Sequence, residues 1–324
     1  MTVDTLSTTA PRTADTTRHL IHRPTSWEHF VLDAPGSGEQ SFVVAGPLPT
    51  GDPLSGDGPG HFHDPRHLTA ELREVGEFVA HQYFGVPAQR PGRYSRLALS
   101  LTDVPAWRVG GAEPPRLTTY LTARPRPAAG REPHGLELGV AVRIGDVPCC
   151  TGDADLVFPA PVPRAGGTGQ GHRAPDAAGP RAAGPDGAGR LVHPAEVGRR
   201  TTADVLVSEP ARSARGRLAM WVLPPAGRPA PAGSAEGPLL EALRQASVLT
   251  AARTWGYDAG LALVADWDVS FRGRARPGPP LRCVAVPGPL DKDDDGRPAV
   301  GVTVTLTQSR TAVAHARTRV VQDL

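Results

Sequence analysis

The sequence predicts an α+β protein built from two tandem copies of one unit, in which a curved antiparallel sheet wraps a long helix. Two aligned segments predict the duplication. Residues 67–85 (HLTAELREVGEFVAHQYFG) and 238–256 (PLLEALRQASVLTAARTWG) align without a gap at an offset of 171, and the same offset aligns 20–22 with 191–193. Because two separate segments share one register, duplication is favoured over chance.

Strand-like apolar runs flank each predicted helix, which completes the plan of one unit. In the first half these runs cover 29–33, 41–45, 96–101, 117–122 and 136–144, and in the second half 203–208, 217–223, 261–271, 281–286, 300–307 and 312–321. Each half therefore combines one long helix with several strands.

Both helices carry apolar residues at a spacing of i, i+4 and i+7. These residues are Leu68, Leu72, Val75 and Val79 in the first helix, and Leu239, Leu243, Ala246 and Leu249 in the second. Pro238 suits a first helical turn, and Gly85 and Gly256 stand where a left-handed C-cap is expected. Further apolar residues lie off these stripes, so each helix is expected to contact other elements over more than one face.

The chain of 324 residues is long enough for two domains that each bury a core. Residues 1–18 are rich in Thr and are predicted to be a disordered tail. An N-terminal domain over 19–159 and a C-terminal domain over 191–324 follow. Between them, 160–190 is rich in Pro, Gly and Ala, has almost no large apolar residue, and is predicted to be a disordered linker.

Composition excludes several classes of function. A net charge of +2, with Arg interspersed among Asp and Glu, argues against nucleic-acid binding. No apolar stretch approaches the ~18 residues of a membrane span, and no signal segment is evident. Three cysteines cannot form a disulfide framework, and we expect them to be buried small apolar residues. A cytoplasmic protein is expected.

One buried helix followed by about four long antiparallel strands describes the hot-dog architecture, here doubled into an intramolecular pseudo-dimer. The first half carries the motifs HRPTSWEHFVLD, HDPRHLTAELREVG and HQYFGVP, and the second half carries PAEVGRRTTADVLVSE and GPLLEALRQA. These motifs resemble the A-factor biosynthesis (AfsA-type) double hot-dog proteins of actinobacteria. The resemblance covers nearly all of the chain outside the tail and linker, and its second-half motifs are the more specific.

The resemblance implies transfer of a β-ketoacyl group from acyl carrier protein to the hydroxyl group of dihydroxyacetone phosphate, in the biosynthesis of γ-butyrolactone-type autoregulators. No metal or nucleotide cofactor is implied, because the acyl group arrives on the phosphopantetheine of the carrier protein. Two alternatives stay open. One is a hot-dog thioesterase or dehydratase, and the other is a non-catalytic regulatory protein that binds an acyl ligand.

Acyl transfer from a thioester to an alcohol needs a base, donors for the developing oxyanion, and a cation for the phosphate of the acceptor. Glu241 and Arg244 lie three residues apart on one helix face, with Gln245 beside them. We expect Glu241 to be the base, Arg244 to anchor the phosphate or the thioester carbonyl, and Gln245 to support them. The alternative is an ion pair on a solvated helix face.

The first half departs from this pattern. Arg73 aligns with Arg244, but Ala70 aligns with Glu241, and the nearest carboxylate, Glu71, is one residue late. One residue is about 100° of helical rotation, which is enough to aim a side chain elsewhere. We expect a degenerate first site, unless a nearby carboxylate has replaced the missing one. The candidates for that replacement are Glu71 and Glu74.

Histidines precede the first helix in the motif GHFHDP, where His61, His63 and Asp64 suggest a catalytic or metal site. The alternative is that Asp64, directly before Pro65, caps the helix while the histidines stay exposed. We favour capping, because the second half has no equivalent histidine.

Two further patterns receive structural interpretations. The acidic run at 291–296 (DKDDDG) resembles the start of a calcium loop but lacks its terminal Glu, so a charged hairpin turn is expected. Four arginines are expected to be exposed, and a role in docking an acidic carrier protein is open for them. They are Arg199, Arg200, Arg212 and Arg215.

Overall fold

A computed structural model of the chain describes residues 18–22, 38–48, 62–110, 115–126, 133–160, 189–212, 216–223, 236–276 and 279–323. Several predictions fall on other residues. The tail over 1–18 and the linker over 160–190 lie outside the described residues except at their ends, and the strand at 29–33, His61 and Arg215 lie outside them altogether.

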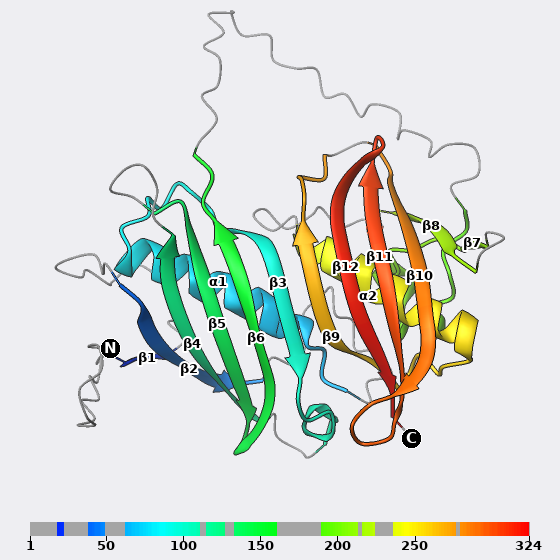
Figure 1. Cartoon of the computed structure of the whole chain (residues 1–324), viewed down its shortest axis with the longest axis horizontal. Helices are drawn as coiled ribbons and strands as arrows, with labels where there is room; N and C mark the ends of the chain where they lie inside the picture. Colours follow the sequence, from blue (N-terminus) through cyan, green and yellow to red (C-terminus); the bar gives the residue numbers. More distant parts are fainter. Residues whose placement is uncertain are drawn as a thin grey trace, which may run out of the picture.

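The described strands form one continuous 12-stranded sheet (Figure 1). The strands of the first half are β1 (Arg18–His22), β2 (Gln40–Pro47), β3 (Arg93–Leu101), β4 (Arg116–Arg126), β5 (Gly135–Ile144) and β6 (Val147–Val157). Those of the second half are β7 (Ala211–Arg212), β8 (Leu218–Val222), β9 (Ala262–Phe271), β10 (Leu281–Lys292), β11 (Pro298–Gln308) and β12 (Thr311–Gln322).

The order of the strands shows the predicted duplication. Outward from the centre, the first half runs β3-β6-β5-β4-β2 and the second half runs β9-β12-β11-β10-β8. The two halves meet where β3 pairs antiparallel with β9, in a register that sets Leu97 opposite Val269. Equivalent strands therefore lie at equivalent distances from one central strand pair, as a pseudo-twofold arrangement requires.

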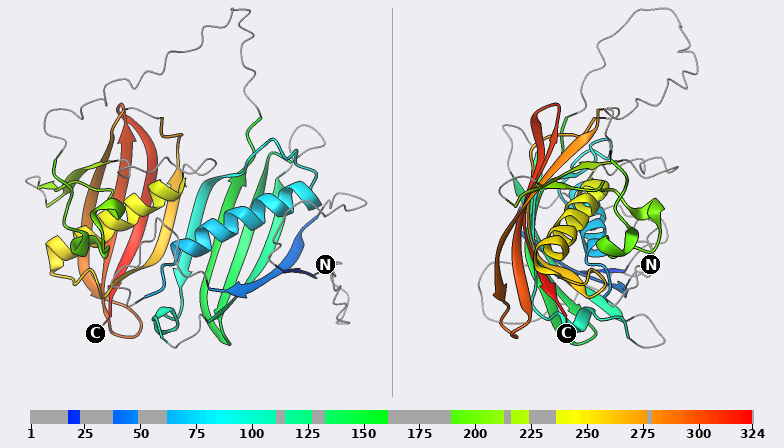
Figure 2. Two further views of the ribbon diagram at one scale, coloured as in Figure 1. Left: turned by 180° about the vertical axis from the view of Figure 1, so that it is seen from behind. Right: turned by 90° about the vertical axis from the view of Figure 1, so that its right-hand side faces the viewer.

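Each half places one long helix on the same face of the sheet (Figure 2). The helices are α1 (Arg66–Tyr83) and α2 (Glu236–Trp255). All eight apolar residues of the predicted helical stripes are buried, which fits their packing against the sheet. Gly85 and Gly256 follow the helices with φ of 68° and 76°, so the predicted left-handed C-caps are confirmed.

The two helices differ on the side that faces away from the sheet. Residues 189–212, which include the short 3-10 helices η2 (Pro194–Val197) and η3 (Thr202–Asp204), cover this side of α2 (Figure 2). On α1 the outward residues Ala70 and Glu74 are exposed. This difference decides which charged helix residues become buried.

Two strand predictions need correction. The predicted strand at 203–208 is η3 followed by extended chain that makes only isolated bridges through Val207 and Ser208. The strand β6 was not predicted, because Pro148, Gly152 and two aspartates interrupt its apolar alternation.

Other predictions of local structure are confirmed. The acidic run at 291–296 forms the turn between β10 and β11, and all three cysteines are buried. None of the described helices is long and apolar enough to span a membrane.

Candidate functional site

Glu241, on the second turn of α2, lies at the centre of a buried cluster of charges. Its side chain is 1% exposed, because the segment 189–212 covers this face of the helix. The predicted neighbours on α2, Arg244 and Gln245, are buried as well. The alternative of an ion pair on a solvated face is therefore wrong.

Both carboxylate oxygens of Glu241 accept hydrogen bonds from two guanidinium groups. Arg199 donates from Nε to Oε1 at 2.8 Å and from Nη2 to Oε2 at 2.9 Å. Arg244 donates from Nε to Oε2 at 3.0 Å and from Nη2 to Oε1 at 3.1 Å. Gln245 Nε2 donates a further hydrogen bond to Oε1. Such paired contacts fix the orientation of a carboxylate closely.

A third guanidinium group reaches Glu241 from the first half of the chain. Arg66, the first residue of α1, places Nη1 at 2.8 Å from Glu241 Oε2. Asp64 holds Arg66 through contacts of 2.6 to 3.1 Å, and it also accepts a hydrogen bond from Arg199 Nη2 at 3.0 Å. The cluster therefore lies at the boundary and contains residues from both halves, because the start of α1 meets the first turns of α2.

Gln245 connects the cluster to the covering segment. Its Oε1 accepts a hydrogen bond from the Leu206 backbone N–H at 2.8 Å, and its Nε2 donates to the Asp204 carbonyl at 2.7 Å. Arg244 Nη2 donates to the Val197 carbonyl at 2.7 Å in the same segment. These bonds satisfy backbone groups that no strand partner reaches, so the side chains of α2 hold the segment in place.

The electrostatics of the cluster stabilise the ionised forms of its two carboxylates, whereas burial and the neighbouring Arg199 lower the pKa of Arg244. Burial alone would raise the pKa of Glu241, but Arg244, Arg66 and Arg199 overcome this effect and hold the pKa well below its ordinary value. For Asp64 burial is likewise outweighed by the arginines, and the pKa of that carboxyl is also well below its usual range. Both carboxylates are therefore ionised throughout the neutral range.

Three guanidinium groups against two carboxylates leave one net positive charge in the cluster. Among the described residues, no hydrogen bond engages the Nη1 atoms of Arg199 and Arg244. Their side chains are 4% and 11% exposed. A buried site with excess positive charge and two unused donors has the chemistry of an anion site.

This geometry bears on the expected role of each residue. A base needs a free lone pair and a pKa near the working pH. The oxygens of Glu241 are occupied by three arginines and a glutamine, and its pKa is lowered. The arrangement therefore favours Glu241 as the residue that orients the arginines, and it favours Arg244 and Arg199 as anion ligands.

The first half does not repeat this cluster. Ala70 is exposed although it aligns with the buried Glu241, so the two positions share a helical register but have different environments. Arg73 pairs instead with Glu77, from Nη1 to Oε1 at 2.8 Å. Glu71 is buried and has an interaction partner.

In the loop before α1, Asp64 contacts the start of the helix and His63 is half-buried. Pro65, and not Asp64, occupies the N-cap position of α1, and the N-cap makes no side-chain hydrogen bond. Asp64 Oδ1 still accepts the backbone N–H of Arg66, the first residue of α1, at 3.0 Å, and the same carboxylate belongs to the charged cluster. His63 is half-buried, and its buried Nε2 has no hydrogen-bond partner among the described residues. Burial, and after it the nearby His67, lowers the pKa of His63. The expectation that this histidine is exposed is therefore wrong.

Sequence reasoning missed two arginines of the cluster. Arg199 was expected at an exposed surface, but it is buried against Glu241. Arg66 received no role, because its contact with Glu241 spans 175 positions of sequence and depends on how α1 meets α2. The only sequence signal for these arginines was that each lies within a motif quoted above. Arg199 lies in GRRTTAD, and Arg66 lies in HDPRH.

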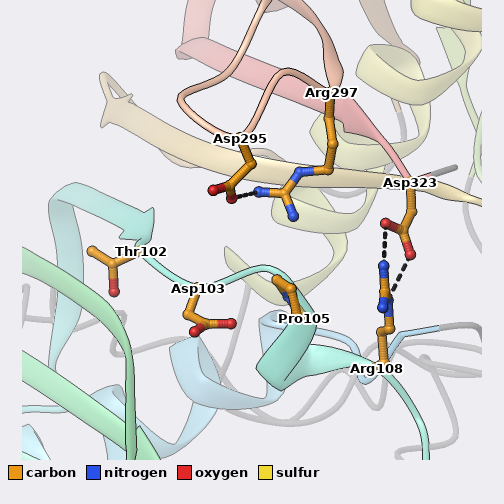
Figure 3. A pocket seen from close by; sticks show the side chains of 7 residues that line it. All are labelled: Thr102, Asp103, Pro105, Arg108, Asp295, Arg297 and Asp323. Atoms are coloured by element: carbon orange, nitrogen blue, oxygen red, sulfur yellow. Dashed lines mark hydrogen bonds and ion pairs between the residues drawn. The ribbon is translucent and has the colours of Figure 1, made fainter.

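A separate polar cavity of about 430 Å³ lies between the halves near the C-terminal end of β12 (Figure 3). Arg108 from the first half donates two hydrogen bonds to Asp323 from the second half, at 2.7 and 2.6 Å. Arg297 is paired with Asp293 and Asp295. Because these arginines are neutralised, the cavity lacks the excess positive charge of the cluster around Glu241.

Solved structures show what fold the chain shares. A pyran synthase domain from module nine of the sorangicin pathway matches with a TM-score of 0.51 and 10% identity, over 91% of this chain and 97% of that one. The tesB protein of Mycobacterium avium subs paratuberculosis matches over 92% and 97% at 10% identity, but its TM-score of 0.45 is too low to carry an argument. At such identity the first match shows the fold alone, and the predicted α+β class with tandem hot-dog units is confirmed.

No protein with a curated description matches the sequence. The A-factor biosynthesis hotdog domain family matches residues 181–322. The match contains three members of the charged cluster, Arg199, Glu241 and Arg244, together with the segment that covers α2. The second half of the chain therefore matches the A-factor biosynthesis hotdog domain, in agreement with the AfsA-type family that the quoted motifs resemble.

Proposed function

We propose that the protein is an acyltransferase that moves a β-ketoacyl group from acyl carrier protein to dihydroxyacetone phosphate, in the biosynthesis of γ-butyrolactone-type signalling molecules. The observation that carries the proposal is the net positive cluster at the boundary between the halves. Its unused Arg199 and Arg244 Nη1 donors suit a phosphate group or a thioester carbonyl, and both belong to this reaction.

In this proposal Glu241 orients the two arginines that bind the anion, while Gln245 keeps the covering segment closed over them. Removal of water strengthens each of these electrostatic contacts. The acyl group arrives on phosphopantetheine, so acyl carrier protein is the proposed partner. Arg200 is exposed on the covering segment and remains a candidate contact for it.

A second candidate function is binding of an acyl ligand without turnover. It is favoured by the saturation of Glu241, because a carboxylate with no free lone pair leaves the cluster without a base. A thioesterase or dehydratase is the third possibility, since hot-dog enzymes of these classes also act on acyl thioesters.

One assay separates the three functions. The purified protein is incubated with β-ketoacyl carrier protein, with and without dihydroxyacetone phosphate, and ester product and free thiol are followed by mass spectrometry. Ester that forms only with the acceptor supports the transferase. Thiol release without the acceptor supports a thioesterase, and the absence of both products leaves a binding protein or a dehydratase. Loss of water from a β-hydroxyacyl carrier protein without thiol release identifies the dehydratase.

A further inference from the structure

Glu236, the first residue of α2, differs from every other buried carboxylate in the described part of the chain. Four buried side-chain atoms there lack a hydrogen-bond partner, and they are His63 Nε2, Thr119 Oγ1, Glu236 Oε2 and Tyr257 Oη. Glu236 supplies the one carboxylate oxygen of this set, and the residue is 8% exposed. A buried carboxylate oxygen without a partner is costly, so this group needs a proton or a ligand.

Charged groups from three elements act electrostatically on Glu236 or on Tyr94, on which the charge of Glu236 also acts. Arg73 and Glu77 lie on α1, Arg93 and Tyr94 lie on β3, and Arg274 follows β9. Arg73 forms an ion pair with Glu77, in which Nη1 lies 2.8 Å from Oε1. Within the described residues, none of the three arginines forms an ion pair with Glu236.

Tyr94 forms the apolar wall of this region. Its hydroxyl group donates to the Thr69 carbonyl at 2.6 Å, and its ring stacks on Phe271 with centroids 6.3 Å apart. Burial raises the pKa of Tyr94, and the charges of Arg73, Glu236 and Glu77 all act on it. Tyr94 therefore stays protonated, and its proton is already donated to a backbone carbonyl.

The two buried glutamates of α2 have opposite proton affinities. Burial raises the pKa of Glu236, and its own backbone N–H together with the surrounding arginines offsets only part of this effect. The pKa of Glu241 is lowered by its three arginines. Five residues separate the two, which is a rise of about 7.5 Å and a rotation of about 140° on the helix, so Glu236 lies outside the arginine cluster.

The duplication explains why the two sites differ. The offset of 171 aligns Glu236 with Pro65, the residue between Asp64 and Arg66. The start of each helix thus faces the other half of the molecule. The first half supplies a cation to Glu241 in this way, and the second half supplies a carboxyl group that interacts electrostatically with Tyr94 and Arg73.

We propose that Glu236 is the acid–base residue at the boundary between the halves, where its carboxyl group exchanges a proton with the hydroxyl group of the acyl acceptor. The inference rests on the proposed acyl transfer. The carboxylate takes the proton as the acceptor oxygen bonds to the thioester carbon. The C–S bond then breaks, the leaving sulfur takes that proton from Glu236, and ester and free thiol result.

The first test needs no substrate. A hydrophobic carbodiimide reacts with protonated carboxyl groups in apolar surroundings, and peptide mass spectrometry identifies the modified residue. As the pH is lowered, the wild-type protein is expected to be modified at Glu236 at a higher pH than at Glu241, because burial raises the pKa of Glu236 and the arginines lower the pKa of Glu241. The Glu236→Gln variant is expected to lose this label. Absence of label on Glu236 in the wild-type protein overturns the inference.

The second test measures ester formation in a single turnover as a function of pH. In the wild-type protein the rate is expected to rise as Glu236 loses its proton. Glu236→Gln should lower the rate about 10²-fold and remove this rise, which is the scale for a positioned acid–base group. Glu74→Gln, which removes an exposed carboxylate of α1, is the matched control and should leave the profile unchanged.

His63 is the rival base, because its buried Nε2 also lacks a partner. If His63→Gln removes the pH-dependent rise while Glu236→Gln keeps it, the inference is overturned. If the wild-type protein forms no ester at all, the proposed function fails, and the labelling result alone decides whether Glu236 is a proton-exchanging carboxyl group.

Discussion

Arg66 Nη1 lies 2.8 Å from Glu241 Oε2, and this contact joins the first residue of α1 to the second turn of α2. Both side chains are nearly inaccessible, with exposed fractions of 9% and 1%. The site in the second half is therefore incomplete without the first half. It follows that changes at the start of α1 should affect cluster members of the second half, which lie more than 130 residues away in sequence.

Glu241→Gln should destabilise the protein strongly. The change keeps the shape of the side chain but leaves three buried guanidinium groups without their shared counter-charge, which costs about 3–5 kcal/mol when a buried pair is broken. Urea denaturation measures the loss. Glu77→Gln breaks the more accessible pair with Arg73 and should cost less than about 1 kcal/mol. Equal losses in the two variants would show that the cluster is not a stabilising unit.

The contact between Arg66 and Glu241 should show strong energetic coupling in a double-mutant cycle. We expect an interaction energy of about 1–3 kcal/mol, since the two groups share one buried network. The exposed pair of Arg124 and Glu39, 2.7 Å apart, is the control and should give less than about 1 kcal/mol. A coupling for the buried pair as small as that of the control would contradict the assignment of Arg66 to the cluster.

Arg244→Ala and Glu241→Gln should each lower acceptor-dependent ester formation by about 10²-fold or more, the scale for a positioned electrostatic group. Glu71→Gln should do much less, because Glu71 lies outside the cluster. If Glu241 only orients the arginines, its variant loses rate without any change in the shape of the pH profile. Wild-type rates in the first two variants would remove the cluster from the proposed reaction.

Gly198→Ala should disturb the segment that carries Arg199. Gly198 has a φ of 63°, and an added Cβ would lie 2.9 Å from the Ala259 carbonyl oxygen. The left-handed backbone alone costs about 1–2 kcal/mol for another residue, and the close contact adds to this cost. Gly216→Ala is the matched control, since its φ is 71° and no atom of the described residues lies within 4 Å of an added Cβ. Thermal unfolding should show the larger loss for Gly198→Ala.

Glu236→Gln should stabilise the protein at neutral pH. The pKa of Glu236 is higher in the folded state than in the unfolded state. Its carboxyl group therefore contributes its full stability only at a pH below the unfolded-state pKa, and that contribution is lost as the pH rises through the folded-state pKa. The variant should therefore have a higher denaturation midpoint than the wild type at neutral pH, and the two should converge in acid. A variant that is less stable at every pH would mean that the ionised carboxylate has a favourable partner.

The helical stripes and the capping glycines were predictable from sequence, because burial of one helix face and a left-handed cap leave local patterns. The long antiparallel strands of the second half were predictable for the same reason. Glu241 and Arg244 stood out as a pair, but their surroundings did not. Whether the pair is solvated depends on the segment over 189–212, which has little regular structure and no periodicity to recognise.

The charged cluster also shows where alignment of the two copies fails. Ala70 and Glu241 share a helical register, yet Ala70 is exposed and Glu241 is buried. The difference arises because the segment over 189–212 packs on α2, and this packing depends on tertiary structure. The prediction that Arg199 is exposed was wrong for the same reason. Its sequence neighbourhood resembles any exposed polar turn, and only the packing of that turn on α2 places it against Glu241.

The pairing of β3 with β9 fuses both units into one sheet within a single polypeptide. Two identical subunits joined along the same edge would have to duplicate every substitution, so an acid at one helix start would face an acid at the other. Covalent linkage removes this restriction. One copy could therefore place Arg66 at the start of its helix while the other placed Glu236 there, so that the two originally equivalent halves came to carry different functional groups.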